Sequence, residues 1–438
     1  MWRGSATVPA SSIFCPAYSA DSYVSTAQLE TVRVTSSFTR PSGGPPRDRR
    51  RTVKLWFVLG TAAELIKVFP IITQAEARGI AWTVVSTGQS GINFWREYEE
   101  FGLPLSCAMT AVETGRDLAE RGSALKWFIK AWRWNPGKGL RTDIGTGRRR
   151  QAGERSLAGD RTASNLLVVH GDTLSTIVGA HWGRRQGWPI VHVEAGLRSN
   201  RLLSPFPEEI TRRVVSRWAD FHMTPDAWSA DNLRRAGHRG RVVDTGANTL
   251  VDALDWILEK HRLQDRRSGP YAVANLHRFE NLNSASRWAF LVETLEKAAR
   301  QRAVVLVLHP QTRYKIDRQP GLRSRLEEMG VTLVDRLPFR QFIHLLAGAE
   351  LVISDGGSNQ EECFYLGTPC LLLRDATERQ VGLGSTAVLA GFSRVTVDEF
   401  LSDPQRYRRA PWRPARSPSA VILDVLASYA PCSSTSSR

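Results

Sequence analysis

Short apolar runs separated by turn residues recur along most of the chain after residue 52. Runs of this kind predict strands of a parallel sheet, because a strand that is covered on both faces has no polar side. The longer stretches between them predict connecting helices, so the chain is expected to alternate strand and helix. The predicted strands are 53–59, 81–86, 165–169, 189–193, 221–224, 241–244, 271–275, 303–308, 331–335, 351–354 and 370–373.

Breaking and capping residues predict where several helices begin and end. Pro70 is expected to kink or end the helix that starts near residue 62, since proline has no N–H for the helix interior. Gly187 is expected to end the helix between the strands at 165–169 and 189–193. Pro207 and the acids after it predict another helix start. One buried face is expected on that helix, formed by Ile210, Val214, Val215 and Trp218.

The alternation restarts after T-G-A-N-T at 245–249, which predicts two similar α/β halves with a cleft between them. The expected domains are an N-terminal Rossmann-like domain at 52–247, with a long loop at 135–163, and a C-terminal one at 248–415. A helix within 416–438 is expected to pack back on the first domain. The composition of residues 1–51 fits a disordered extension, a start codon placed too far upstream, or an organellar presequence.

Composition narrows the class of protein. The 438 residues exceed one typical core, and no apolar run reaches the roughly 18 residues of a membrane span. The five cysteines are scattered, which predicts neither a disulfide framework nor a zinc site and suits a reducing cytoplasm. The net charge of +16 lies largely in loop-like basic segments without a nucleic-acid motif. We therefore expect neither a nucleic-acid partner nor a membrane partner.

Acidic residues follow two neighbouring strands of the first half. Asp172 comes after N-L-L-V-V-H-G and Glu194 after P-I-V-H-V, one strand–helix–strand crossover apart. Ligands of open parallel sheets bind outside the carboxyl ends of the strands, so both carboxylates are expected at a cleft. Taken singly, Asp172 is as well explained as a turn residue and Glu194 as a surface charge. Together with Arg198 and Glu208, they favour acid/base chemistry.

The second half carries an anion-binding pattern. The strand at 351–354 runs into S-D-G-G-S-N-Q-E-E, where two glycines and a helix start can hold a diphosphate. Ser358 and Glu361 are expected to form a capping box, and Glu362 to reach a ribose diol. His277 and Arg278 follow the first strand of this half, and the basic residues of R-D-A-T-E-R follow its last predicted strand.

These motifs, in order H-G-D-T, H-V-E-A-G-L-R, P-E-E, H-R-x-E-N, G-G-x-x-Q-E-E and T-E-R, closely resemble the bacterial non-hydrolysing UDP-N-acetylglucosamine 2-epimerases over residues 53–430. The resemblance implies a GT-B-like α/β fold, with two Rossmann-like doubly wound parallel-sheet domains and UDP held mainly by the second. It implies interconversion of UDP-GlcNAc and UDP-ManNAc for surface polysaccharide synthesis, by elimination and re-addition of UDP. It also implies no metal or nicotinamide cofactor, and commonly a homodimer.

The resemblance assigns roles to residues of this chain. Asp172, Glu194 and Glu208 match the family's catalytic carboxylates, which either move protons at carbon 2 or stabilise an oxocarbenium-like state, and His277 matches its catalytic histidine near the leaving group. Which acid serves which face of the sugar is left open. The positions expected to bind substrate are Lys67, Arg198, Arg278, Phe339, Gly357, Ser358, Glu362 and Arg379.

Several positions depart from the family's pattern. Ala62 and Ala63 replace an arginine–proline pair, so an arginine that helps hold the nucleotide sugar is lost. Ser90 replaces a histidine where many relatives bind an activating second UDP-GlcNAc, so that regulation is not expected here. These departures favour an altered substrate or a weaker phosphate grip. A hydrolysing 2-epimerase, a GT-B glycosyltransferase and an inactive UDP-binding paralogue remain as alternatives.

Overall fold

The computed structural model describes residues 53–113, 121–134, 164–199, 207–260 and 269–429. The extension expected at 1–51 and the loop expected at 135–163 lie outside these residues. Within the described part of the chain, no helix has the length and apolar character needed to span a membrane.

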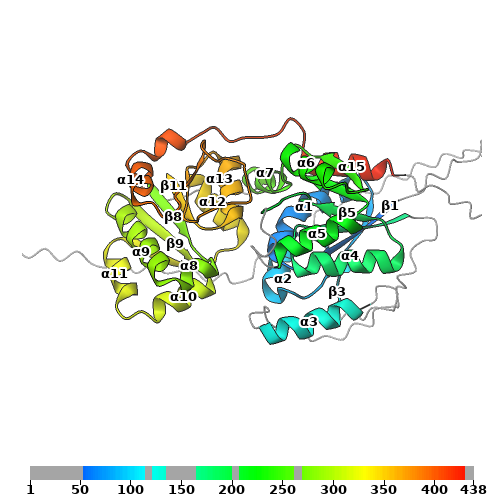
Figure 1. The fold of residues 1–438 in the computed structure, drawn as a ribbon, viewed down its shortest axis with the longest axis horizontal. Coiled ribbons are helices and arrows are strands. Elements are labelled where there is room, and N and C mark those ends of the chain that lie inside the picture. Colours follow the sequence, from blue (N-terminus) through cyan, green and yellow to red (C-terminus); the bar gives the residue numbers. More distant parts are fainter. Residues whose placement is uncertain (1–52, 114–120, 135–163, 200–206, 261–268, 430–438) are drawn as a thin grey trace, which may run out of the picture. The chain divides into compact units, whose positions relative to one another are not determined.

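A seven-stranded, fully parallel sheet forms the first domain, with strand order β3-β2-β1-β4-β5-β6-β7 (Figure 1). The order reverses between β1 and β4, which makes the sheet doubly wound. Its strands are β1 (Val53–Leu59), β2 (Ala81–Ser86), β3 (Ala108–Thr110), β4 (Ser164–His170), β5 (Ile190–Val193), β6 (Phe221–Thr224) and β7 (Arg241–Asp244).

The second domain repeats this plan with a six-stranded parallel sheet of order β10-β9-β8-β11-β12-β13. Its strands are β8 (Tyr271–Asn275), β9 (Ala303–Leu308), β10 (Val331–Asp335), β11 (Leu351–Ser354), β12 (Cys370–Leu372) and β13 (Ala387–Leu389). The expected α/β fold with two parallel-sheet domains is confirmed. Each predicted strand agrees with the structure within one residue at either end, whereas β3 and β13 were not predicted.

Helices connect the strands and cover the sheets (Figure 1). Those of the first domain are α1 (Ala62–Ala77), α2 (Gly91–Glu100), α3 (Arg121–Arg133), α4 (Leu174–Gln186), α5 (Glu208–Trp218) and α6 (Ala227–Arg235), followed by α7 (Leu250–Lys260). Those of the second are α8 (Phe279–Asn283), α9 (Ala285–Ala299), α10 (Pro310–Asp317), α11 (Leu322–Glu328), α12 (Phe339–Gly348), α13 (Gly357–Leu366) and α14 (Arg394–Ser402), before the last helix α15 (Pro418–Ala427). Short 3-10 turns lie at Leu105–Cys107 and Pro404–Tyr407.

Both faces of the first sheet are buried, as its near-continuous apolar strands require. Along β1, Leu55 and Phe57 belong to one apolar cluster, whereas Trp56 and Val58 belong to another on the opposite face. The first cluster continues through α7 into the second domain, where it includes Val273. The apolar core therefore supports both sheets.

Helix α15, drawn in red in Figure 1, packs against α1 and α7. Gln74 of α1 donates a hydrogen bond from Nε2 to Oγ of Ser417, at 3.0 Å. Arg78 pairs with Asp424 of α15 at 2.7 Å. The end of the described chain thus returns to the helix that follows β1.

Two helix predictions need correction. Helix α1 continues through Pro70, because residues on both sides, including Phe69 and Ile71 at 0% exposed, are held in the core. That burial outweighs the roughly 3 kcal/mol of an interior proline. Helix α5 starts at Glu208 with Pro207 as its cap, and the residues buried on it are mostly polar: Glu209, Thr211, Arg212, Val215 and Ser216. Of the expected apolar face, Val215 is buried and Trp218 packs partly buried against the same apolar cluster. Ile210 and Val214 are only partly buried.

Candidate functional site

Two left-handed turns carry acidic residues at neighbouring strand ends. β4 and β5 pair in parallel, so Asp172 and Glu194 emerge at the same edge of the sheet, as expected. Gly171, just before Asp172, has φ +64, and Glu194 itself has φ 61. A glutamate rarely adopts this conformation, and such strain persists where the surrounding structure enforces it, often at functional sites.

The Glu194 carboxylate lies in a buried cluster of polar side chains. Its side chain is 7% exposed, and Oε1 accepts hydrogen bonds from Nζ of Lys67 and Nδ2 of Asn248, each at 2.6 Å. Arg379 of the second domain approaches the same oxygen at 3.4 Å. Burial disfavours the charged form, but Lys67 and Arg379 more than offset it and hold the pKa of Glu194 well below its usual value. This acid is therefore ionised at neutral pH.

A second pair of acids has different surroundings. Oδ2 of Asp172 accepts from Nε and from a terminal nitrogen of Arg212, at 2.8 and 2.5 Å. Glu208 begins α5, and its Oε2 is buried with no hydrogen-bond partner in the described structure. Burial, reinforced by the charge of Asp172, raises the pKa of Glu208. One acid is thus paired to a cation, and the other holds its proton more readily than an ordinary glutamate.

The glycine turn of the second domain leaves a helix start open. Gly356 caps α13 without any side-chain hydrogen bond, so the expected capping box of Ser358 and Glu361 does not form. A Cβ at Gly356 would lie 2.9 Å from Cε1 of His277, and one at Gly357 would lie 2.9 Å from Oε1 of Glu378. A side chain at either position would require its neighbour to move, and the first N–H groups of α13 remain available to an anion.

His277 is held at the end of β8 by an acid that was not predicted as part of the site. Asp355 accepts hydrogen bonds from the backbone N–H groups of His277 and Arg278, at 2.9 and 3.0 Å. The imidazole of His277 stacks on His309 with ring centres 4.4 Å apart. Burial lowers the pKa of His277, and although Asp355 opposes the shift, the ring is neutral at neutral pH.

A cavity of about 240 Å³ collects many of the predicted substrate-binding residues. It is lined from the first domain by Lys67, and from the second by the predicted residues His277, Phe339, Gly357, Ser358 and Glu362. Burial raises the pKa of Glu362 to about 7, while Asn359 donates to its Oε2 at 2.7 Å. The two domains also meet where the Phe339 N–H donates to Oε1 of Glu97, at 3.3 Å.

The remaining predicted residues are not among those that line this cavity. Charge interactions join Glu208 to Arg278, and Asp172 to Arg379, across the two domains. Arg278 pairs with Glu280 at 2.6 Å. Arg198 instead donates to Leu197 and Ser216 within the first domain, so the structure does not bring its guanidinium into the cavity.

Four residues that the sequence interpretation missed organise the site: Arg212, Asn248, Asp355 and Glu361. Glu361 lies within 3.5 Å of both Lys67 and Arg379, and burial raises its pKa. The signals were present in the sequence. Arg212 falls one helical turn after Glu208, and Asp355 directly follows a predicted strand. Among the described residues, no group of three His, Cys, Asp or Glu side chains is arranged to hold a metal ion.

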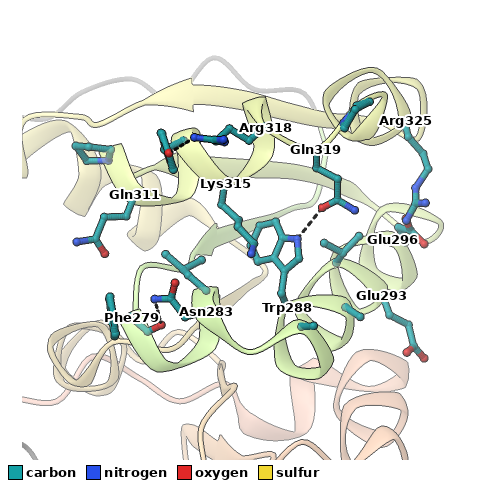
Figure 2. A pocket seen from close by; sticks show the side chains of 17 residues that line it. Phe279, Asn283, Trp288, Glu293, Glu296, Gln311, Lys315, Arg318, Gln319 and Arg325 are labelled. Atoms are coloured by element: carbon teal, nitrogen blue, oxygen red, sulfur yellow. Dashed lines mark hydrogen bonds and ion pairs between the residues drawn. The ribbon is translucent and has the colours of Figure 1, made fainter.

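A larger groove of about 1050 Å³ lies elsewhere in the second domain, between α8, α9, α10 and α11 (Figure 2). Figure 2 shows Trp288 in its wall, with the indole N–H bonded to Gln319 at 2.9 Å. The acids Glu293 and Glu296 are paired with arginines. None of the predicted site residues lines this groove.

Comparisons with known proteins identify the family of the chain. The sequence model of the family described as UDP-N-acetylglucosamine 2-epimerase matches residues 155–411. A UDP-N-acetylglucosamine 2-epimerase of Methanocaldococcus jannaschii is 26% identical over 392 residues, covering 84% of this chain and 98% of the relative. A UDP-2,3-diacetamido-2,3-dideoxy-D-glucuronate 2-epimerase of Pseudomonas aeruginosa is 34% identical over 218 residues, covering 48% and 59%.

The fold has solved counterparts. The crystal structure of the Methanocaldococcus jannaschii UDP-GlcNAc 2-epimerase in complex with UDP-GlcNAc and UDP superposes with a TM-score of 0.65 at 24% identity, covering 85% of this chain and 99% of that one. The expected GT-B-like fold is therefore confirmed. The chain belongs to the UDP-N-acetylglucosamine 2-epimerase family, whose members are epimerases acting on carbohydrates.

Proposed function

We propose that this protein interconverts UDP-GlcNAc and UDP-ManNAc, or a modified UDP-N-acetylhexosamine, by eliminating UDP and adding it back without releasing free sugar. The observation that carries the proposal is the shared carboxylate of Glu194, which Lys67 of the first domain and Arg379 of the second both approach. An acid of the first domain and cations of both domains thus meet in one cluster. A reaction that separates a proton and an anionic leaving group needs both.

The chemistry consists of one elimination and one addition. A carboxylate takes the proton from carbon 2 while the bond between carbon 1 and the phosphate oxygen breaks, so a carbon 1–carbon 2 double bond forms and UDP leaves with the bonding electrons. UDP then adds back to carbon 1, and a proton reaches carbon 2 from the other face. Asp172, Glu194 and Glu208 are the proposed acids. The raised pKa of Glu208 suits proton exchange near neutral pH.

The second domain is proposed to hold UDP throughout. Free N–H groups at the start of α13, near Gly357 and Ser358, face the cavity that also contains Lys67 and can bind the diphosphate. Glu362 is placed in the same cavity for the ribose diol. The neutral ring of His277 carries an N–H that can donate to the leaving oxygen.

Proton NMR of the purified protein with UDP-GlcNAc in heavy water tests the proposal. We expect deuterium at carbon 2 and a second UDP-sugar as the product. A carbon 2 proton that never exchanges rejects epimerisation by this route. Free UDP that rises in step with turnover identifies a hydrolysing enzyme, turnover only with an added acceptor identifies a glycosyltransferase, and UDP binding without turnover identifies an inactive paralogue.

A variant pair then tests the acids. Glu194→Gln is expected to abolish measurable exchange at carbon 2, because the amide cannot take up a proton as a carboxylate does. Glu327→Gln, at an exposed position on α11, is the matched control and should exchange normally. Full activity in Glu194→Gln would remove this acid from the mechanism.

The sugar of the substrate is the finer part of the proposal. Ala63 lines the nucleotide cavity where the family pattern has an arginine–proline pair at 62–63, and one relative acts on a diacetamido-glucuronate nucleotide. We therefore propose competition between UDP-GlcNAc and UDP-2,3-diacetamido sugars as the assay of preference. A role in surface polysaccharide synthesis, a cytoplasmic location and a homodimer stay predictions. Tracing of isotope-labelled sugar into polysaccharide tests the first prediction. Cell fractionation tests the location, and light scattering tests the homodimer.

A further inference from the structure

We propose that His192 is a positioning residue for the acids at the edge of the first sheet. Its Nε2–H holds the carbonyl of Gly171 and thereby fixes the turns that carry Asp172 and Glu194. The inference rests on the proposed function only in taking these two acids as catalytic.

The contact lies between the two strands that end in acids. His192 is on β5, two residues before Glu194, and is 1% exposed. Its Nε2 lies 2.7 Å from the carbonyl oxygen of Gly171, which follows β4 directly and precedes Asp172. The Gly171 N–H in turn donates to the Val193 carbonyl at 2.9 Å. Both the carbonyl and the N–H of Gly171 therefore hydrogen-bond to residues of β5, which fixes the turn after β4.

The same turn lies against the second acid. A Cβ on Gly171 would come within 3.3 Å of Oε2 of Glu194. Gly171 adopts its positive φ without strain, but the positive φ of Glu194 is costly, so that turn depends on its neighbours to keep its conformation. Loss of the histidine contact would free the Gly171 carbonyl, and both carboxylates would lose their fixed positions.

The hydrogen bond defines the state of the ring. A carbonyl can only accept, so Nε2 of His192 must carry the hydrogen. Its Nδ1 has no hydrogen-bond partner among the described residues. Burial lowers the pKa of His192 to about 4, which keeps the ring neutral at pH 7. A buried, neutral ring whose one donor is already used serves position rather than proton transfer.

The neighbouring strand supplies a matched control. His222 pairs in register with His192 across β5 and β6 and is 0% exposed. Neither of its ring nitrogens has a hydrogen-bond partner among the described residues. His222→Leu therefore removes a buried imidazole from the same sheet without removing the Gly171 contact.

The experiment compares His192→Leu, His192→Gln and His222→Leu with the parent. Glutamine keeps an N–H donor at about the reach of Nε2, whereas leucine has none. We expect His192→Leu to lower kcat about 100-fold, as an ångström of misplacement does, with KM and the affinity for UDP almost unchanged. His192→Gln should recover most of the lost kcat. His222→Leu should keep kcat even where its melting temperature falls as far.

Three outcomes overturn the proposal: His192→Leu with full kcat, His192→Gln as slow as His192→Leu, or His222→Leu equally slow. Nitrogen-15 NMR of labelled histidine adds a readout that needs no turnover. A neutral ring protonated at Nε2, with the signal altered in Gly171→Ala, supports the contact, and an Nδ1–H ring contradicts it. Failure of the parent to exchange carbon 2 would count against the function, while this readout still decides the contact.

Discussion

Glu194 follows β5 of the first sheet and Asp355 follows β11 of the second, so both acids lie at strand ends, yet their carboxylates have different partners. Glu194 is contacted by side chains of Lys67, Asn248 and Arg379. Asp355 instead gives its oxygens to the backbone N–H groups of His277 and Arg278. Long side chains can rearrange around a substrate, whereas backbone donors cannot. An acid at a strand end is therefore reactive or structural according to what occupies its lone pairs.

The two sheet edges differ in the same way. The first edge gathers carboxylates and places cations against them. The second edge has the open start of α13 and a glycine turn. Its acid, Asp355, accepts hydrogen bonds from the backbone of the loop that carries His277. The comparison supports the proposal of proton transfer at the first edge and anion binding at the second. Four changes test that division.

The largest effect is expected from the first edge. Glu208→Gln should lower kcat about 1,000-fold, because the amide cannot exchange a proton, while UDP binding persists. Steady-state kinetics and calorimetric titration with UDP measure the two quantities separately. Glu327→Gln serves as control. If Glu208→Gln weakens UDP binding and leaves kcat unchanged, the division of roles between the two edges is wrong.

The structural acid should respond through stability. Asp355→Ala leaves two backbone N–H groups and the Asn281 amide without their acceptor, so we expect a loss of about 3 kcal/mol in the free energy of unfolding. Urea denaturation measures it. Asp375→Ala, at an exposed acid nearby in sequence, should lose much less. Equal stability of the two variants would contradict a structural role for Asp355.

A buried acid of the second edge should make stability depend on pH. Burial raises the pKa of Glu362 to about 7 from 4.5, so the folded protein binds more protons than the unfolded chain between these values. The contribution is full below pH 4.5 and is lost as pH rises through 7, by about 3 kcal/mol in all. Urea melts from pH 5 to 7.5 should show this slope, and Glu362→Gln should flatten it. If Glu399→Gln, at an exposed position of α14, flattens the slope equally, the pH dependence of stability does not come from Glu362.

The smallest effect concerns the anion cradle. Gly357→Ala places a methyl group 2.9 Å from Oε1 of Glu378 and 3.2 Å from Nε of Arg379. We expect about tenfold weaker UDP binding with little change in melting temperature, since the shift is confined to the helix start. Calorimetry with UDP and a thermal melt check this. Undiminished affinity would show that this turn does not contact the nucleotide.

Much of this architecture could be predicted from local pattern. Buried parallel strands are apolar along their length, so β1, β4 and β9 were recognisable at their correct positions. The strands β3 and β13 have three residues each, of which only the first is buried, whereas the equally short β12 is buried throughout and was predicted. Pro70 and the predicted capping box at Ser358 failed for a common reason. In both places the wider structure overrode the local preference. Helix α1 continues at Pro70 because its neighbours are buried in the core, and α13 begins after Gly356, so Ser358 is not at the N-cap position.

The sequence by itself determined the order of strands and helices, the strand-end positions of Asp172, Glu194 and His277, and the glycine turn before α13, because these depend on residues close together in the chain. Only the tertiary structure decided which acids are charged, which pair with a cation, and which accept hydrogen bonds from the backbone. Those properties depend on burial and on partners such as Lys67 and Arg379, which lie far from Glu194 in sequence and meet it only across the folded domains. Electrostatic free energy follows distance and desolvation in space, and neither is written in local spacing.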